Sequence, residues 1–241
     1  MGAPMRDRVI VALDHPDAAS ALACARALAG RARWMKVGMT LFYAEGPGVV
    51  AALRDLGFDV FVDLKLHDIP HQVEGAARSL GGLGAGMLTV HASGGADMME
   101  AAVRGAAAGA EAAGVARPAV IAVTVLTSMD ADALASVGVT DSPADQVAGL
   151  AALAKTCGVD GVVCSPQEAA SMRALLGPSA LVVTPGVRPA WAEAGDQARI
   201  ATPAGAVAAG ASHLVIGRPI TGAEDPAAAF DRIVNEGQET P

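Results

Sequence analysis

The feature that most constrains this chain is a regular alternation of short apolar runs with longer helix-forming segments along its 241 residues. Runs with the length and composition of buried strands occur at 8–14, 34–38, 58–64, 86–91, 119–125, 161–164, 180–184 and 213–217. Helices are predicted between them, at about 18–29, 46–56, 73–80, 95–113, 143–156, 168–175 and 226–235. This alternation is typical of βαβ crossovers and a parallel sheet.

Eight strand–helix units in a chain of this length favour a closed barrel over an open doubly wound sheet. An open sheet usually has fewer, longer units and a glycine-rich first turn, whereas the first turn here reads Asp14-His15-Pro16. We therefore expect an α/β fold, a single (β/α)8 TIM barrel, with one domain across residues 1–241. In such barrels the chemistry lies at the carboxyl ends of the strands, so polar residues there are the candidates for a site.

Composition narrows the class of protein. Apolar residues make up 52% and charged residues 17% of the chain, which favours a folded core over disorder. A formal charge of -8 argues against nucleic acid as the main partner, although a local basic site for a small anion is compatible with it. The cysteines Cys24, Cys157 and Cys164 lack C-x-x-C spacing, which favours buried thiols of a reducing compartment. With no signal peptide and no stretch long enough to span a membrane, we expect a cytoplasmic protein.

The most unusual strand is the third, which runs into the sequence Phe-Val-Asp-Leu-Lys-Leu-His-Asp-Ile-Pro at 61–70. Side chains alternate on a strand, so Asp63 and Lys65 point to the same face, and Asp68 follows just beyond the strand end. Pro70 marks where the next helix can begin. A lone Asp-x-Lys pair is often a structural salt bridge, but at the end of a barrel strand it favours a functional site.

Other strand ends carry further polar residues. Lys36 lies in an otherwise apolar strand, where an unpaired ammonium group would be costly. One economical arrangement lets Lys36 and Lys65 alternate with Asp63 and Asp68, so that each charge has opposite neighbours. His91 ends the fourth strand, but a hydrogen-bonded barrel residue is an equally good interpretation and we assign it no role. The remaining polar residues at strand ends are Asp14, Thr127, Ser128 and Arg218.

The segment after the seventh strand indicates an anion site. The connection at about 185–203 is the longest non-periodic one in the chain and carries Arg188 and Gln197. The eighth strand then runs into Gly217 and Arg218. Gly-Arg-Pro alone is most often an ordinary turn with a solvated arginine. Barrels commonly bind phosphate with the loops after strands seven and eight, so the combination predicts a phosphate site with a gripping loop.

With these residues in place, the chain resembles the orotidine 5′-phosphate decarboxylase family over nearly its whole length. The matching segments, in order, are Ala12-Leu13-Asp14, Lys36-Val37-Gly38, Asp63-Leu64-Lys65-Leu66-His67-Asp68-Ile69-Pro70, Leu126-Thr127-Ser128, Thr184-Pro185-Gly186-Val187-Arg188, Gly195-Asp196-Gln197 and Val215-Ile216-Gly217-Arg218-Pro219-Ile220-Thr221. The chain departs from the family at His71-Gln72, where relatives with this motif usually carry Asn-Thr near the substrate ribose.

The resemblance implies decarboxylation of orotidine 5′-phosphate to UMP with no metal or cofactor. It implies that Lys65 donates a proton to C6 of the pyrimidine and that Asp63 lies beside the departing carboxylate. Lys36 and Asp68 would complete the charged network and contact the ribose, with Asp68 reaching the site of the partner subunit in a homodimer. The substrate-binding residues that it implies are Asp14, Thr127, Ser128, Pro185, Arg188, Gln197, Gly217 and Arg218.

Two other interpretations are open at this point. A magnesium-dependent phosphosugar decarboxylase or synthase would share the Asp-x-Lys-x-x-Asp strand but would use a metal ion and an enediolate. A nucleotide-binding regulator, built on a barrel that has lost catalytic activity, would bind UMP without turnover, although the presence of both lysines and both aspartates argues against it. Activity in a chelator separates the first alternative from a metal-free decarboxylase.

Overall fold

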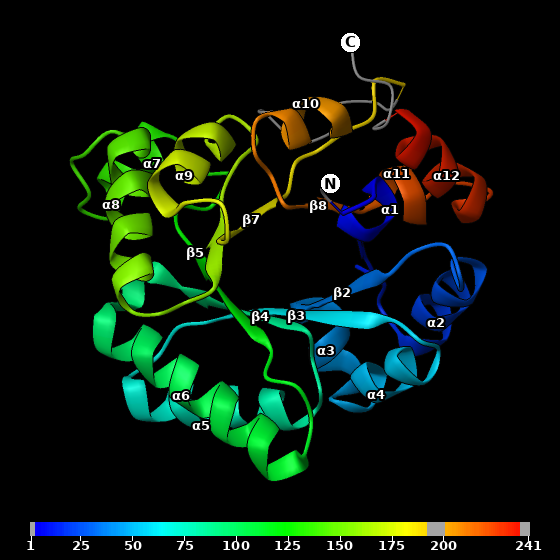
Figure 1. The fold of residues 1–241 in the computed structure, drawn as a ribbon, viewed down its shortest axis with the longest axis horizontal. Coiled ribbons are helices and arrows are strands. Elements are labelled where there is room, and N and C mark those ends of the chain that lie inside the picture. The colour runs from blue at the N-terminus through cyan, green and yellow to red at the C-terminus, as the bar shows by residue number, and fades with distance from the viewer. Residues whose placement is uncertain (1–2, 192–200, 237–241) are drawn as a thin grey trace.

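The computed structural model describes residues 3–191 and 201–236 as a closed parallel barrel with helices around it (Figure 1). The strands follow one another around the barrel in chain order, and β8 pairs with β1 to close it. The predicted (β/α)8 TIM barrel is therefore confirmed. The strands are β1 (Val9–Ala12), β2 (Trp34–Gly38), β3 (Asp59–Leu66), β4 (Met87–His91), β5 (Ala119–Val123), β6 (Gly161–Val163), β7 (Leu181–Thr184) and β8 (His213–Ile216).

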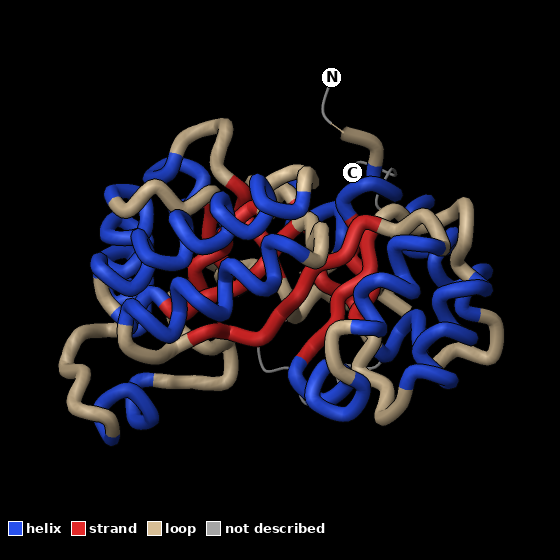
Figure 2. The backbone as a smooth tube through the Cα atoms, turned by 90° about the horizontal axis from the view of Figure 1, so that it is seen from below, coloured by secondary structure: helices blue, strands red, loops and turns tan. Residues whose placement is uncertain are grey.

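Helices cover the outside of the strands, which lie enclosed in the middle of the molecule in Figure 2. Seven of them match the predicted helices: α2 (Ala18–Ala27), α4 (Gly48–Asp55), α5 (Pro70–Gly82), α6 (Ala96–Ala113), α8 (Pro143–Thr156), α9 (Ala169–Leu176) and α12 (Pro226–Glu236). The short helices α1 (Met5–Arg8), α3 (Met39–Glu45), η1 (Ala92–Gly94), α7 (Ala131–Ser136), α10 (Pro203–Ala208) and α11 (Arg218–Thr221) were not predicted.

Local sequence signals set the starts of several helices. The Asp17 carboxylate accepts a hydrogen bond of 2.8 Å from the backbone N–H of Ser20 and so caps α2. Ser142 caps α8 in the same way through the N–H of Asp145. Pro70 occupies the first position of α5, where its missing N–H would have no partner anyway. Each cap contributes about 1 kcal/mol to helix stability.

The barrel interior is filled and is not a channel. Its buried core consists of one large side chain from most strands, namely Ile10, Trp34, Phe61, Met87, Ile121 and Val183. A second, larger apolar layer lies between the strands and the helices. Because side chains fill the lower barrel, the pocket that the barrel strands line lies above them, at the carboxyl ends of the strands.

Helices α5 and α6 lie side by side and approach closely because glycines face the neighbouring backbone (Figure 1). A Cβ added at Gly105 would collide with the carbonyl of Glu74, and one added at Gly109 would collide with the carbonyl of Arg78. The scarcity of aromatic residues and the abundance of small ones in the chain therefore correspond to close helix packing.

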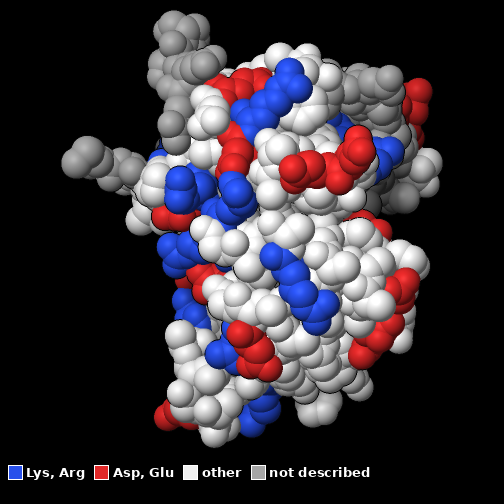
Figure 3. All heavy atoms as spheres, turned by 90° about the vertical axis from the view of Figure 1, so that its right-hand side faces the viewer, with Lys and Arg blue, Asp and Glu red and all other residues white. Residues whose placement is uncertain are grey.

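The outer surface carries charges of both signs. On the face that holds α2, α4 and α12, basic and acidic side chains of the described residues are interspersed (Figure 3). The guanidinium group of Arg31 pairs with Asp231 of α12 on this side.

Within the described part of the chain, none of the helices is both long and apolar enough to cross a membrane. Cys24, Cys157 and Cys164 are free and buried, as predicted.

Candidate functional site

A pocket of about 280 Å³ opens at the carboxyl ends of the strands. It is lined by residues from seven of the eight strands or from the turns that follow them, and most of the predicted site residues are among them. The predicted residues that line it are Asp14, Lys36, Asp63, Lys65, Thr127, Pro185, Arg188, Gly217 and Arg218. Side chains from segments far apart in the sequence thus meet at this end of the barrel.

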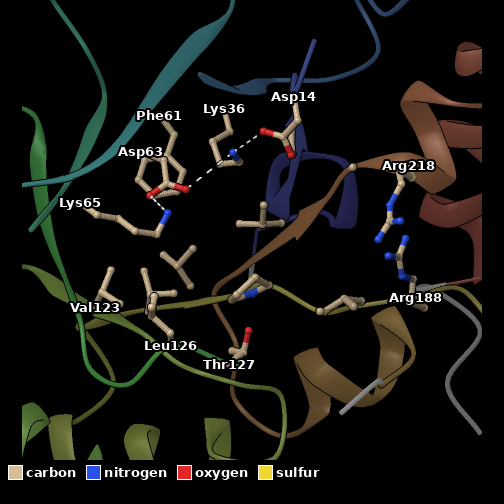
Figure 4. Close-up of a pocket in the computed structure, with 18 of the residues that line it drawn as sticks. Asp14, Lys36, Phe61, Asp63, Lys65, Val123, Leu126, Thr127, Arg188 and Arg218 are labelled. Atoms are coloured by element: carbon tan, nitrogen blue, oxygen red, sulfur yellow. Dashed lines mark hydrogen bonds and ion pairs between the residues drawn. The ribbon is translucent and has the colours of Figure 1, made fainter. Parts of the chain in front are cut away.

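Four charged side chains form an alternating row along one wall of the pocket (Figure 4). Lys36 Nζ lies 2.9 Å from Asp14 Oδ1 and 3.7 Å from Asp63 Oδ2. Lys65 Nζ lies 2.9 Å from Asp63 Oδ1. Each interior charge therefore has an opposite neighbour, with Asp14 rather than Asp68 at the Lys36 end of the row within one subunit.

Because the row is partly buried, its charged groups depend on the ion pairs between them. Lys36 is only 7% exposed, and an ammonium group at that depth is stable only because two carboxylates contact it. Burial raises the pKa of the Asp63 carboxyl. The ammonium groups of Lys36 and Lys65, with hydrogen bonds from Lys65 and Thr89, outweigh burial and bring the pKa of Asp63 below its ordinary value. Asp63 is thus held as a carboxylate between two cations.

The backbone of β3 is irregular at the charged row. Its pairing with β4 runs from Val62↔Leu88 directly to Leu66↔Val90, so that residues 63–65 lie opposite the single residue Thr89. Within this bulge Lys65 has φ of 52°, the left-handed region that an L residue adopts at a cost of roughly 1–2 kcal/mol. Among the described residues other than glycine, Lys65 alone has a positive φ. Such strain at a pocket is typical of functional sites.

The opposite end of the pocket is cationic. Arg188 follows β7, and its backbone N–H donates a 2.9 Å hydrogen bond to the carbonyl of Ala201, which joins the two ends of the loop. Arg218 begins α11 immediately after Gly217 and β8. The two guanidinium groups point toward each other across the side of the pocket away from Lys65 (Figure 4). Two guanidinium groups so close together favour a multivalent anion between them.

Apolar side chains also line the pocket. The side chains of Val123, Leu126, Val163 and Val215 line the pocket, and those of Val123 and Leu126 face Lys65 from the opposite wall (Figure 4). A ligand that spans the pocket thus meets alternating charges at one end, two arginines at the other end and apolar side chains in the lining. This arrangement suits an elongated, anionic, partly aromatic molecule.

Some predicted residues do not join the pocket within one subunit. Asp68 is exposed, and its Oδ1 accepts a 2.6 Å hydrogen bond from the N–H of Ile69. Ser128 is also exposed and is not part of the pocket lining, whereas its neighbour Thr127 is. Gln197 and the part of the gripping loop at 192–200 lie outside the described residues. His71 and Gln72, at the start of α5, are exposed.

His91 lies near the charged row but outside the pocket lining. It ends β4, and its ring stacks at a tilt on that of His67 with centroids 5.3 Å apart. Burial, together with the charges of His67 and Lys65, lowers the pKa of His91. No site role follows from this position.

Sequence reasoning did not single out Thr89 or the packing role of Gly38. The Thr89 hydroxyl is fully buried and hydrogen-bonded to both the carboxylate of Asp63 and the backbone of Lys65. A Cβ at Gly38 would lie 2.9 Å from Lys36 Nζ. The signal for Thr89 was its alternation with Met87 and His91, which places a polar side chain on the inward face of a barrel strand.

Comparison with known proteins gives consistent relatives. The model of the family described as "Orotidine 5'-phosphate decarboxylase / HUMPS family" matches residues 7–233. Proteins named orotidine 5'-phosphate decarboxylase from Anaeromyxobacter sp. (strain K) and Halorhodospira halophila are 56% and 53% identical, over 92% and 98% of this chain and 95% and 98% of theirs. The crystal structure of orotidine 5'-phosphate decarboxylase from Lactobacillus acidophilus superposes with a TM-score of 0.86 at 40% identity, covering 96% of this chain and 99% of that one.

Proposed function

Because the chain belongs to the orotidine 5′-phosphate decarboxylase / HUMPS family, we propose that it converts orotidine 5′-phosphate into UMP and CO2 without a metal or cofactor. The observation that carries the proposal is the alternating row in which Lys65 and Asp63 pair at 2.9 Å beside the buried Lys36. The Anaeromyxobacter and Halorhodospira relatives bear the decarboxylase name at more than half sequence identity, which favours this branch of the family over a phosphosugar synthase.

The two charged ends of the pocket suggest how the substrate lies. The carboxylated pyrimidine ring faces Lys65 and Asp63, and the ribose hydroxyls face Asp14 and Lys36, which pair at 2.9 Å. Thr127 and Ser128 are proposed to contact the ribose and the base. The 5′-phosphate then lies between the arginines after β7 and β8, at the opposite end of the pocket from Lys65.

The chemistry follows from the fixed charges. When the bond between C6 and the carboxylate breaks, CO2 leaves and the electron pair stays on C6, in an orbital that the ring cannot delocalise. The ammonium group of Lys65 stabilises this charge and then donates one proton to C6, and the resulting amine regains a proton from water. Asp63 lies beside the departing carboxylate and keeps the Lys65 ammonium in place through their 2.9 Å contact. No electron sink is required from a cofactor.

The phosphate end contributes binding energy remote from the reacting carbon. We propose that Pro185, Arg188, Gln197, Gly217 and Arg218 bind the phosphate, with the loop at about 185–203 as the gripping segment. The hydrogen bond between Arg188 N–H and the carbonyl of Ala201, at 2.9 Å, supports this role because it anchors the loop base beside the pocket. Phosphate binding can thereby offset the cost of assembling the charged site around the substrate.

We further propose that the functional unit is a homodimer in which Asp68 completes the site of the partner subunit. Asp68 is exposed and outside the row of its own chain, which supports a role across an interface. Large apolar side chains are exposed in the segments that follow β2 and β3: Met39 is 47%, Tyr43 73% and Ile69 63% exposed. Covering such residues would favour association of two copies at this end of the barrel.

Mixed dimers test this arrangement. Lys65→Ala and Asp68→Asn subunits, each inactive alone, are mixed under conditions that exchange subunits. If Asp68 acts across the interface, the mixed species contains one site with both native residues and about half of the native activity per heterodimer returns. If both residues serve the same subunit, activity stays at the level of the separate variants.

A chelator assay tests the reaction itself. Loss of orotidine 5′-phosphate is followed by absorbance, and UMP is identified as the product, with and without EDTA. Full activity in EDTA is expected because the ammonium groups of Lys36 and Lys65, at 3.7 and 2.9 Å from the two oxygens of Asp63, already supply positive charge beside this carboxylate. A strict magnesium requirement would support a phosphosugar enzyme, and UMP binding without turnover would support a regulator.

The compartment is part of the same proposal. A cytoplasmic enzyme that binds a small anionic nucleotide, without nucleic acid or membrane as partner, agrees with the net charge of -8. The three free, buried cysteines are typical of a reducing compartment.

A further inference from the structure

Thr89 occupies a distinctive place beside the charged row. It lies in the middle of β4 with no solvent exposure, and its side chain shares the inward face of the strand with Met87 and His91. Its hydroxyl donates a 2.9 Å hydrogen bond to Asp63 Oδ1 and accepts one of 2.9 Å from the backbone N–H of Lys65. Asp63 Oδ1 also accepts from Lys65 Nζ, at 2.9 Å.

These contacts close a ring that holds Lys65 at both ends. The backbone of Lys65 is bound directly by the hydroxyl of Thr89, and its ammonium group is bound through the carboxylate that the same hydroxyl orients. The hydroxyl oxygen of Thr89 therefore holds the Lys65 backbone directly and holds the Lys65 ammonium group through Asp63.

The bulge in β3 explains why such a hydroxyl is needed. Residues 63–65 lie opposite Thr89 alone, so regular pairing with the backbone of β4 is interrupted there. The Lys65 N–H finds its acceptor in a side chain instead, and Lys65 adopts a φ of 52° that lysine does not favour by itself. The strained conformation persists because the surrounding contacts determine it.

We propose that Thr89 is a positioning residue for the decarboxylation: its hydroxyl locks the β3 bulge in the conformation that aims the Lys65 ammonium group at the reacting carbon. The proposal rests on the proposed function for the identity of the reaction. Thr89 does not line the pocket, so it acts through Lys65 and Asp63 and not through contact with substrate.

The matched substitution is Thr89→Val, which keeps the shape and the branched Cβ but removes the oxygen. Because the Lys65 N–H then loses its acceptor, the bulge relaxes and the ammonium group shifts by the order of an ångström. We expect kcat to fall about 100-fold, the loss typical of a misplacement of about 1 Å, with KM changed less than about threefold because phosphate binding is untouched. Thr89→Ser, which retains the hydroxyl, should recover most of the rate.

Thr124→Val is the control for removal of a buried threonine hydroxyl. Thr124 is 4% exposed and donates a 3.1 Å hydrogen bond to the carbonyl of Val163, which does not belong to the charged row. Thr124→Val should therefore keep native kcat. If Thr89→Val does not fold, Thr89→Ala and Thr89→Ser form a pair that differs by one oxygen, and only the serine variant should be active.

A crystal structure of Thr89→Val provides a readout that does not depend on turnover. We expect Lys65 with a negative φ and its ammonium group separated from Asp63. A Lys65 that keeps its positive φ and its contact with Asp63 would overturn the positioning role, as would an unchanged kcat in an enzyme that decarboxylates. If the native protein does not decarboxylate orotidine 5′-phosphate, the proposed function fails, and the conformation of Lys65 in the variant still decides the role of Thr89.

Discussion

Gly38 offers a perturbation that should disturb the site while sparing the fold. It ends β2 with φ of -90°, a backbone conformation that alanine adopts without strain. A Cβ placed there would lie 2.9 Å from Lys36 Nζ and 3.2 Å from Asp14 Oδ1. Both neighbours are the ends of side chains, so the methyl group of Gly38→Ala can be accommodated if the ion pair moves.

The size of the effect follows from these distances. To reach ordinary contact at 3.4 Å, the Lys36 ammonium group must withdraw by about 0.5 Å from a position where it pairs with Asp14 at 2.9 Å and faces Asp63 at 3.7 Å. Since a misplacement of about 1 Å costs about 100-fold in rate, a shift of half that size should cost about tenfold in kcat/KM. Tenfold corresponds to about 1.4 kcal/mol of transition-state stabilisation.

The assay compares steady-state kinetics with thermal unfolding. Gly38→Ala should lower kcat/KM for orotidine 5′-phosphate about tenfold and change Tm by no more than about 2 °C, because the fold does not depend on the tip of Lys36. Gly149→Ala in α8 serves as the control, because a Cβ there meets nothing within 4 Å. A native kcat/KM in Gly38→Ala would refute the geometric reasoning, and so would a variant that loses activity only by unfolding.

Three further predictions concern the proton donor, the helix interface and the base of the barrel. Lys65→Ala should reduce decarboxylation by at least about 10⁴-fold, because it removes both the proton donor and the stabilising charge, while calorimetry should find UMP binding largely retained. Gly109→Ala should lower the free energy of unfolding by at least about 2 kcal/mol, measured in urea, because its Cβ would meet the carbonyl of Arg78, whereas Gly149→Ala should raise it slightly. Burial, aided by nearby arginines, lowers the pKa of His213 to about 4. As the pH falls, the unfolded chain therefore protonates this histidine near pH 6.5, whereas the native protein protonates it only near pH 4. Stability should therefore fall by up to about 3 kcal/mol between those pH values, and His213→Gln should show a shallower pH dependence; identical slopes would contradict this role.

Much of the fold was predictable because the local sequence pattern indicates each strand. The eight strands are largely apolar runs, and their predicted and observed bounds differ by only a few residues. The connections were less predictable. The predicted helix at 46–56 corresponds to α4, but the chain also forms α3 before Gly46, which has φ of 70°, and Pro47. Short helices such as α7 form because packing stabilises them, and their sequences alone show too few turns of periodicity to indicate it.

The candidate site was also predictable only in part. Asp63 and Lys65 were predicted to share a face because alternation along a strand is a local rule, and both line the pocket. The pairing of Lys36 with Asp14 was not predicted, because it depends on how two different strands are staggered around the closed barrel. The part assigned to Gln197 lies outside the described residues.

By itself, the sequence determined the number and order of the strands and which charged residue types stand at their carboxyl ends, because burial and alternation act between neighbours along the chain. Only the tertiary structure decided which charge meets which, that β3 bulges opposite Thr89, and that Lys65 takes a left-handed backbone. Those features arise when the barrel closes and sets the register between strands whose residues lie more than twenty positions apart, such as Asp63 and Thr89. A lysine residue does not favour such a conformation by itself, and the contact with Thr89 across the sheet stabilises it.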